Sequence, residues 1–281
     1  MIKNELYKAF INKRFLLVLL IETLLIVWYT IDEAIPLMNE YMLQLNEDFI
    51  TWEYPDKMVN RLPYGAYYMW IVFNFCKQSV VLYAVLPILA AIPYGDSLYT
   101  ENRSHYEYHL LMKSGKRQYY TAKLITLFIS GGTVAMFPFL LSFLINAAIM
   151  PLEQVSVATF QYMASPTLFS DLFYKSPILY IILFLILTFI CFGILNCFCF
   201  VGAYLLNNRF VVSIFPFAIY FVSRVIETSV FSSSGMTPWF SFQIKNLSKN
   251  ELLPVIMSMI IMVIIIAVVY LFKCRKKGDE L

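Results

Sequence analysis

The chain has 281 residues, of which 60% are apolar when aromatic residues and cysteine are included, while only 14% are charged and the net charge is +3. Because a soluble domain carries about a quarter charged residues, this composition excludes a soluble globular protein, a disordered chain and a nucleic-acid-binding protein. The five cysteines do not indicate a disulfide framework, since three of them lie inside one apolar run.

The first fourteen residues, 1–14, precede the apolar part of the chain. Ile2, Leu6 and Phe10 recur every four residues and basic side chains occupy the other faces, which favours a short interfacial helix at the inner leaflet. An ordinary basic leader that sets the topology is the alternative. The apolar run that follows is long and has no small-x-small cleavage site after it, so we expect an uncleaved membrane anchor.

Six apolar stretches approach the length of about 20 residues that a helix needs to cross a bilayer core of about 30 Å. Since a segment in lipid must satisfy its backbone hydrogen bonds internally, each stretch is predicted to be a helix. We therefore expect an all-α integral membrane protein with six transmembrane helices in a single domain, 1–281. The predicted spans are 15–31, 78–94, 124–150, 177–206, 210–226 and 252–272.

The distribution of charge orients these spans. Six spans place both termini on one side, and with cytoplasmic termini most of the Lys and Arg residues fall inside while most of the acidic residues fall outside. This agreement with the positive-inside rule predicts that the N-terminus and the C-terminus are both cytoplasmic.

The segment 32–77 is the largest predicted outer region. Apolar residues recur at helical spacing between positions 34 and 49, so an amphipathic helix is expected on the outer face. Residues 64–76 are rich in aromatic side chains and either dip into the outer leaflet or lengthen the second helix, with Lys77 near the water boundary. Spacing leaves open whether this segment gates a pathway or only covers the bundle, and we favour covering.

The segment 95–123 is the one sizeable cytoplasmic element between predicted spans. Its sequence predicts a helix from about Ser97 to Lys113, followed by a turn at Ser114 and Gly115. A soluble partner on the cytoplasmic side must therefore use this loop together with the N-terminal helix.

Sequence motifs for catalysis or nucleotide binding are absent: the chain has no P-loop, no H-E-x-x-H and no G-x-S-x-G. Its two histidines, His105 and His109, lie four residues apart on the predicted loop helix, one turn after Glu101, and this spacing could hold a metal on one helix face. Two histidines alone make a weak site, so we favour a solvated or partner-facing helix. We predict no metal, no cofactor and no enzymatic activity in this chain.

Ionisable residues occur in two of the predicted spans. Glu22 lies midway along the first span, where a lone carboxylate is costly and faces either a pathway or a polar partner. A structural hydrogen bond to Asn196 or Asn146 is the alternative to a translocation role. Arg224 and Glu227 lie three residues apart near the outer end of the fifth span, and we favour an interfacial position for this pair. The candidate pathway residues are Glu22, Asn196 and Arg224.

The stretch 86–127, LPILAAIPYGDSLYTENRSHYEYHLLMKSGKRQYYTAKLITL, resembles the membrane permease subunits of the type-2 exporter class of ABC transporters. In that family a Leu-Pro-rich end of the second span leads through an Asp-Ser step and an acidic residue to a helical coupling segment. A Ser/Gly-basic-basic turn and a Lys at the start of the third span follow. The family often has a Gly and a small polar residue after the acidic position, where this chain has Ser104 and His105. The counterparts are Pro87, Asp96, Ser97, Glu101, Ser114, Gly115, Lys116, Arg117 and Lys123.

The resemblance implies that the chain is one half of an ATP-driven exporter in a bacterial cytoplasmic membrane. A separate ATP-binding cassette ATPase subunit, which holds ATP and Mg, would supply the energy. A second permease copy or a related permease would complete the transporter within the membrane lipid. The ATPase would contact the coupling loop at Asp96, Glu101, Arg103, His105, Glu107, Leu110 and Leu111.

The sequence also suggests a class of cargo and two rival functions. An apolar, aromatic-rich interior suits an amphipathic or hydrophobic cargo such as a peptide, a bacteriocin, a drug or a lipid, and the acidic outer segment suits export of a cationic antimicrobial peptide. A non-transporting membrane scaffold or sensor with the same topology would dock its partner through the same loop. A secondary transporter is less well supported, because the two halves of the chain show no repeat and few carboxylates lie within spans.

Overall fold

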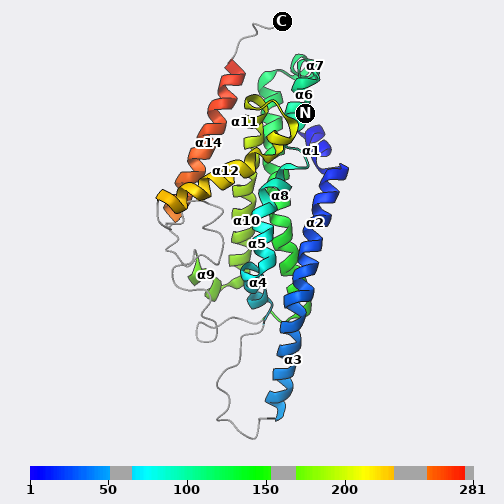
Figure 1. Cartoon of the computed structure of the whole chain (residues 1–281), viewed down its shortest axis with the longest axis vertical. Helices are drawn as coiled ribbons and strands as arrows, with labels where there is room; N and C mark the ends of the chain where they lie inside the picture. Colours follow the sequence, from blue (N-terminus) through cyan, green and yellow to red (C-terminus); the bar gives the residue numbers. More distant parts are fainter. Residues whose placement is uncertain (51–64, 153–168, 231–251, 276–281) are drawn as a thin grey trace.

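A computed structural model describes residues 1–50, 65–152, 169–230 and 252–275 of the chain. These residues form an elongated bundle of helices, and no strand occurs among them (Figure 1). The helices are α1 (Ile2–Phe10), α2 (Lys13–Tyr29), the π-helix η1 (Thr30–Ala34), α3 (Ile35–Ile50), α4 (Ala66–Phe75), α5 (Lys77–Ala91), α6 (Ser97–Arg103), α7 (Tyr106–Ser114), α8 (Lys116–Ile149), α9 (Ser170–Lys175), α10 (Pro177–Asn196), α11 (Phe198–Leu205), α12 (Arg209–Val230) and α14 (Leu252–Arg275).

Four helical stretches in the described part of the chain are long and apolar enough to cross a membrane, and the bent pair α4–α5 makes a fifth. The remaining candidate, predicted at 210–226, corresponds to α12, whose described apolar part Arg209–Ser223 is shorter than the other spans. The expected all-helical membrane fold is thus supported for four or five spans rather than six. The four are Lys13–Leu43, Lys116–Ile149, Pro177–Leu205 and Ile256–Arg275.

The first span is longer than the sequence predicts. Asn12 caps α2 by accepting a hydrogen bond from the backbone N–H of Phe15 at 2.7 Å, and the helix then continues through η1 into α3 without a break. The helix predicted between positions 34 and 49 is present as α3 (Ile35–Ile50), but it continues the first span instead of starting anew. The wide turn of η1 ends two residues before Pro36, which cannot donate a backbone hydrogen bond, and Ile35 between them donates to the carbonyl of Thr30. One wide turn lets the helix continue past the proline.

The second predicted span is bent near its N-terminal end. α4 and α5 meet at Cys76 at an angle of 66°, so the aromatic stretch predicted to dip into the leaflet or to lengthen the second helix forms a separate, buried helix. Trp70 of α4 donates its indole N–H to the carbonyl of Phe139 in α8 at 3.1 Å, and the carbonyl of Met69 accepts the Tyr29 hydroxyl at 2.8 Å. Lys77, at the start of α5, forms an exposed ion pair with Asp32 at 2.7 Å.

The tightest helix pair in the bundle is α8 with α10. Gly131 and Gly132 of α8 lie against Asn196 and Phe189 of α10, where an added Cβ would come within 2.4 Å and 2.6 Å of the nearest atom. Gly193 makes the reciprocal approach to Phe128 at 2.8 Å. Small residues let two backbones pack closely in a membrane bundle, so this pair forms the centre on which α2, α4 and α5 assemble.

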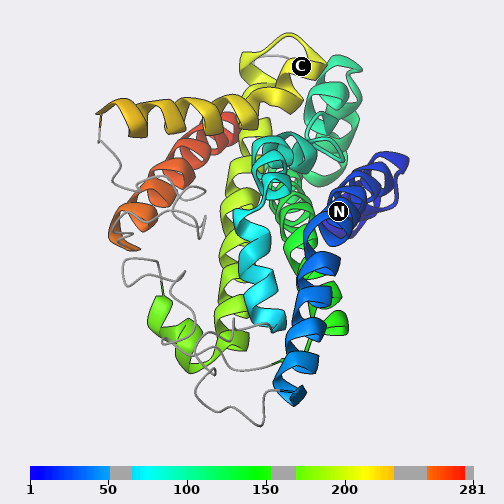
Figure 2. The same ribbon diagram turned by 60° about the horizontal axis from the view of Figure 1, so that its bottom comes forward.

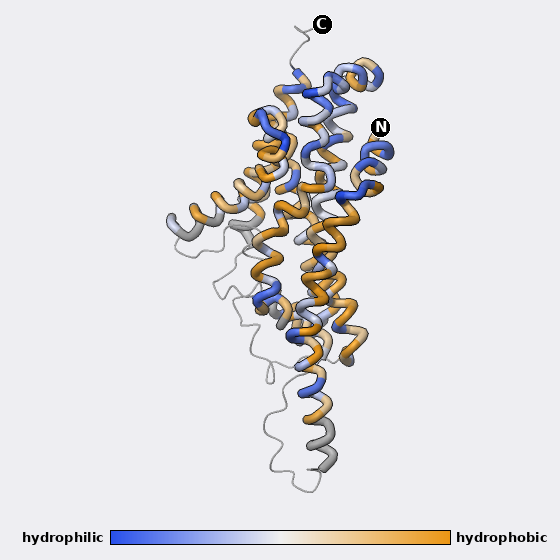
Figure 3. Tube along the Cα trace, turned by 45° about the vertical axis from the view of Figure 1, so that its right-hand side comes forward, coloured by the Kyte–Doolittle hydropathy of each residue, from blue (hydrophilic) through white to orange (hydrophobic). Residues whose placement is uncertain are grey.

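The two ends of the bundle differ in polarity. α1, α6, α7 and the last turn of α14 lie together at one end, here named the loop end (Figure 1). Hydrophilic residues gather there, while hydrophobic residues run along the middle of the bundle (Figure 3). This arrangement agrees with the expectation that both termini lie on the same side. α12 and α14 diverge from the other helices (Figure 2), and α14 exposes apolar side chains along its length.

Candidate functional site

The loop predicted as one helix consists of two. α6 ends at Arg103 and α7 begins at Tyr106, with His105 between them in the left-handed region at φ 56°. Histidine is one of the non-glycine residues enriched in this conformation, so the break replaces the expected continuous helix. His105 and His109 consequently do not share one regular helix with Glu101, and no group of three metal-binding side chains occurs among the described residues. The expected turn is confirmed at Gly115, which has φ 76°.

A buried lysine joins three elements beneath this loop. Lys123, near the start of α8, is fully buried. Its ammonium lies 2.7 Å from a carboxylate oxygen of Glu5 in α1 and 2.8 Å from one of Glu101 in α6, and it donates to the Ser97 hydroxyl at 2.7 Å. Lys8 adds a second, half-exposed cation that reaches Glu5 at 2.8 Å and Glu101 at 3.2 Å. We name the four charges Glu5, Lys8, Glu101 and Lys123 the Lys123 junction; its two cations and two carboxylates balance.

Aromatic side chains enclose the Lys123 junction. The Tyr119 hydroxyl donates to Glu101 at 2.6 Å, and the Tyr94 hydroxyl donates to Glu5. Both rings lie near the Lys123 ammonium, with centroids at 5.6 Å and 5.0 Å. These contacts hold the charges in a protein environment that excludes water and strengthens their attraction.

The electrostatics of Glu5 reflect this environment. Burial alone would raise the pKa of the Glu5 carboxyl, but the charge of Lys123 and the hydrogen bonds from Lys123, Lys8 and Tyr94 outweigh it and hold that pKa at about 2. For Lys8, burial opposes the charged form, yet the hydrogen bond to Glu5 and the nearby Glu101 raise the pKa of the ammonium. Glu5 and Lys8 are therefore ionised throughout the neutral range.

A second ionic contact ties the start of the loop to two further helices. Asp96, which precedes α6, is 6% exposed and accepts hydrogen bonds from Arg14 of α2 at 2.9 and 3.0 Å and from Arg209 of α12. Asn12 also donates its side-chain amide to the carbonyl of Pro93 at 3.0 Å. The turn between α5 and α6 is thus fixed to α2 and α12.

The predicted partner contacts divide between the interior and the surface. Asp96, Glu101 and Glu107 face inward, and Glu107 accepts a hydrogen bond from Tyr120 at 2.9 Å. Burial raises the pKa of the Glu107 carboxyl. The hydrogen bond from Tyr120 and the charge of Lys273 lower this pKa, but by less, so the pKa is raised overall. A buried carboxylate with an intramolecular partner is not free to contact a second protein in this conformation.

The exposed part of the loop lies elsewhere. Arg103 and His105 are exposed, whereas Leu110 and Leu111 are half-buried and pack against the core. Sequence reasoning missed Tyr106, Tyr108 and Met112, which are exposed on α7. The helical spacing of α7 could have identified them. Positions 107, 110 and 111 lie on the face of α7 that packs against the bundle, whereas 106, 108 and 112 lie on its exposed face. We name Arg103, His105, Tyr106, Tyr108 and Met112 the α7 surface.

Glu22 is a buried carboxyl group in the opposite situation, without a partner. It lies on the inward face of α2, one turn from Val18 and Ile26, where this helix packs against α5 and α8. Its side chain is fully buried, and neither carboxylate oxygen has a hydrogen-bond partner among the described residues. An ionisable group without a partner in a span is costly and is typical of a functional position.

The hydrogen bonds expected for Glu22 are absent from the described residues. The Asn146 amide pairs with the Tyr29 hydroxyl at 3.3 Å, and Asn196 donates to the carbonyl of Leu127 at 2.8 Å. Asn196 thereby clamps α10 to α8 at their closest approach. The backbone of Arg224 lies in α12, but the side chains of Arg224 and Glu227 lie outside the described part of the structure.

Fold, hydropathy and charge together indicate a multi-pass helical membrane protein with a structured loop end. No known family matches the chain. No curated protein matches its sequence, and no solved structure matches its fold.

Proposed function

We propose that this chain is the membrane-spanning half of an ATP-driven exporter in a bacterial cell membrane, powered by a separate ATP-binding cassette ATPase. The observation that carries the proposal is the Lys123 junction, which bonds the loop helix α6 directly to α1 and to the start of α8. A partner that moves the loop would therefore move two helices of the bundle with it.

The contacts of the loop supply a route for this movement. The Lys123 junction links α6 to α1 and α8, and the Asp96 contacts link the turn before α6 to α2 and α12. Paired, hydrogen-bonded charges keep one defined geometry, so a rigid-body shift of the loop is transmitted instead of absorbed. Closure of the ATPase subunits would tilt α8 and α2 and change the access of the interior to the two sides of the membrane.

The α7 surface is the proposed docking site for the ATPase. It exposes Tyr106, Tyr108 and Met112 to 48%, 41% and 71%, together with Arg103 and His105. Aromatic residues, methionine and arginine are enriched in protein interfaces. The inward acidic residues Glu101 and Glu107 support this surface from behind and do not need to touch the partner.

A six-helix permease would form half of a transporter, so a second copy or a related chain would complete it. The exposed apolar side chains of α14 would face lipid or this second permease. The bundle interior is apolar and aromatic, as in the cluster of Trp70, Phe139 and Phe184, which suits an amphipathic or hydrophobic cargo.

The test is affinity purification of the tagged chain from its native membrane, followed by mass spectrometry. The docking variant is Tyr108→Ala/Met112→Ala, and the matched control is Met42→Ala, an exposed methionine on α3, away from the loop end. We expect a P-loop ATPase to co-purify with the wild type and the control and to be lost from the docking variant. If the folded wild type brings no ATPase with it, the exporter proposal is wrong and the scaffold or sensor function replaces it.

Glu22 favours a second candidate function, an ion-coupled secondary transporter, because its buried carboxylate has no partner among the described residues and could bind a proton. Reconstituted vesicles separate the two functions. Transport that runs on ATP with the ATPase present supports the exporter, whereas transport that runs on a proton gradient without ATP and is lost in Glu22→Gln supports the secondary transporter.

A further inference from the structure

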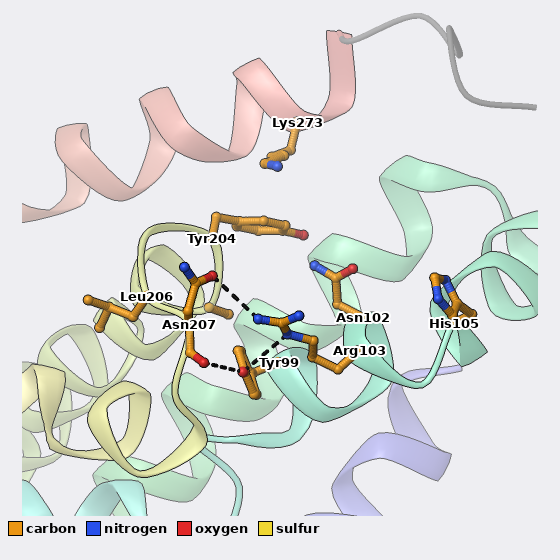
Figure 4. Close-up of a pocket in the computed structure, with 9 residues that line it drawn as sticks. Tyr99, Asn102, Arg103, His105, Tyr204, Leu206, Asn207 and Lys273 are labelled. Carbon is orange, nitrogen blue, oxygen red and sulfur yellow. Dashed lines mark hydrogen bonds between the residues drawn. The ribbon is translucent and has the colours of Figure 1, made fainter.

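A polar pocket of about 410 Å³ opens at the loop end between α6, the connection from α11 to α12 and the last turn of α14 (Figure 4). Arg103 and Lys273 both line it, with His105 beside them, and none of its lining residues is acidic. The composition of the pocket therefore favours an anion.

Arg103 is held in place without an acidic partner. Its guanidinium donates to the Tyr99 hydroxyl at 3.2 Å and to the side chain of Asn207 at 3.5 Å, and the Tyr99 hydroxyl in turn donates to the backbone carbonyl of Asn207 at 2.7 Å. No carboxylate of the described residues forms an ion pair with it, whereas the neighbouring Arg14 and Arg209 both bind Asp96. A guanidinium that is fixed in position and retains free N–H groups is suited to phosphate.

Lys273 reaches the pocket from the opposite wall. Its ammonium lies 3.7 Å from the centroid of the Tyr204 ring, and Figure 4 shows that ring between Lys273 and Arg103. The charge of Lys273 also acts on buried Glu107, where it lowers the pKa of the carboxyl less than burial raises it. Two cationic side chains, Arg103 and Lys273, thus line the pocket from opposite walls.

The surroundings of the pocket indicate a ligand with an apolar part. α14 is an apolar helix that ends here, with Lys273 in its last turn. Leu205 and Phe210, on either side of the connection that forms one wall, are 69% and 75% exposed. Basic pockets between membrane helices on the cytoplasmic side bind anionic lipid headgroups, and these two apolar side chains would contact the acyl chains.

We propose that this pocket binds the phosphate of an anionic phospholipid, with Arg103 and Lys273 as the two phosphate ligands. The lipid site shares Arg103 with the α7 surface, but its test needs no ATPase. It places a lipid headgroup against α6, α11 and α14 at once, so the bound lipid would stabilise the loop end in the membrane.

The experiment is thermal unfolding of the purified chain in a neutral detergent, titrated with phosphatidylglycerol, with phosphatidylcholine or with glycerol 3-phosphate, which carries the phosphate without acyl chains. The variants are Arg103→Gln and Lys273→Gln. Lys113→Gln removes the same charge from an exposed site on α7 that does not line the pocket and serves as the matched control.

We expect phosphatidylglycerol to raise the melting temperature while phosphatidylcholine does not, and each pocket variant to need at least tenfold more phosphatidylglycerol than Lys113→Gln. Equal effects of the two lipids, or an equal loss in Lys113→Gln, would overturn the site. A shift with glycerol 3-phosphate as large as that with phosphatidylglycerol would overturn the lipid assignment and identify a soluble phosphate compound as the ligand. If Arg103→Gln does not fold, Lys273→Gln alone decides the outcome.

Discussion

The Lys123 junction and Glu22 bury acidic side chains in the same bundle under opposite conditions. Glu5 and Glu101 each contact Lys123 and a tyrosine hydroxyl, whereas both oxygens of Glu22 lack a partner among the described residues. Fully paired charges fix the geometry of the elements that carry them. A buried ionisable group without a partner costs stability and persists where function requires it.

This difference assigns the two regions different roles. The Lys123 junction, at the loop end, holds the loop to the bundle, and its residues act by position. Glu22 lies in the first span. We expect its replacement, unlike changes in the Lys123 junction, to leave the fold intact and to alter transport. Changes at the two regions should therefore have opposite effects on stability.

The largest effect is expected at Lys123. Lys123→Met removes the cation and leaves Glu5 and Glu101 buried with one partner fewer, which should lower the free energy of unfolding by about 3–5 kcal/mol. Denaturation in mild detergent measures this loss, and Lys113→Met, at an exposed lysine, should change stability little. The double variant Lys123→Met/Glu5→Gln should recover part of the loss; no recovery would mean that the two side chains do not form a pair.

The second largest effect is expected from acid, which should weaken the Lys123 junction. The pKa of Glu5 is about 2 in the fold against an ordinary value of 4.5, so folding favours its ionised form. Its stabilising contribution, on the order of 3 kcal/mol, is complete above about pH 4.5 and is lost as the pH falls toward 2. Melting temperatures measured from pH 6 to pH 3 should therefore fall less in Glu5→Gln than in the wild type; parallel curves would contradict the low pKa.

A smaller effect is expected at Asp96. Asp96→Asn removes the charge that Arg14 and Arg209 share, but both arginines are half-exposed and regain water. The cost should be about 1 kcal/mol, measured by the same denaturation, and Asp171→Asn at an exposed position is the control. A loss as large as that of Lys123→Met would show that this contact is as critical as the buried one.

Particular residues show how far the sequence predicts this fold. Runs of apolar residues predict most of the long helices, because length and hydropathy alone determine whether a helix can span a bilayer. The continuation of the first helix past Pro36 depends on a single wide turn, and the break at His105 on one left-handed residue. Neither feature changes the hydrophobic period, so neither is visible in it.

The candidate site was less predictable than the fold. Glu22 stands out because it is the only acidic residue in an apolar run, and its position needs no tertiary information. The pairing of Lys123 with Glu5 joins residues 118 positions apart, and only packing brings them together. The sequence alone does not show which loop residues face the bundle, and it therefore predicted that Glu101 and Glu107 contact a partner. The structure turns these two residues inward and exposes Tyr106, Tyr108 and Met112.

The decisive measurement compares two matched substitutions, Glu5→Gln and Glu22→Gln, by thermal unfolding at neutral pH in the same detergent. Glu5→Gln should lower the melting temperature because it leaves Lys123 with one carboxylate instead of two. Glu22→Gln should leave the melting temperature unchanged or raise it, because it removes only a carboxyl group that has no partner among the described residues, and it should abolish transport in reconstituted vesicles. A fall of similar size in both variants, with transport retained in Glu22→Gln, would contradict the distinction between a structural and a functional buried carboxyl group.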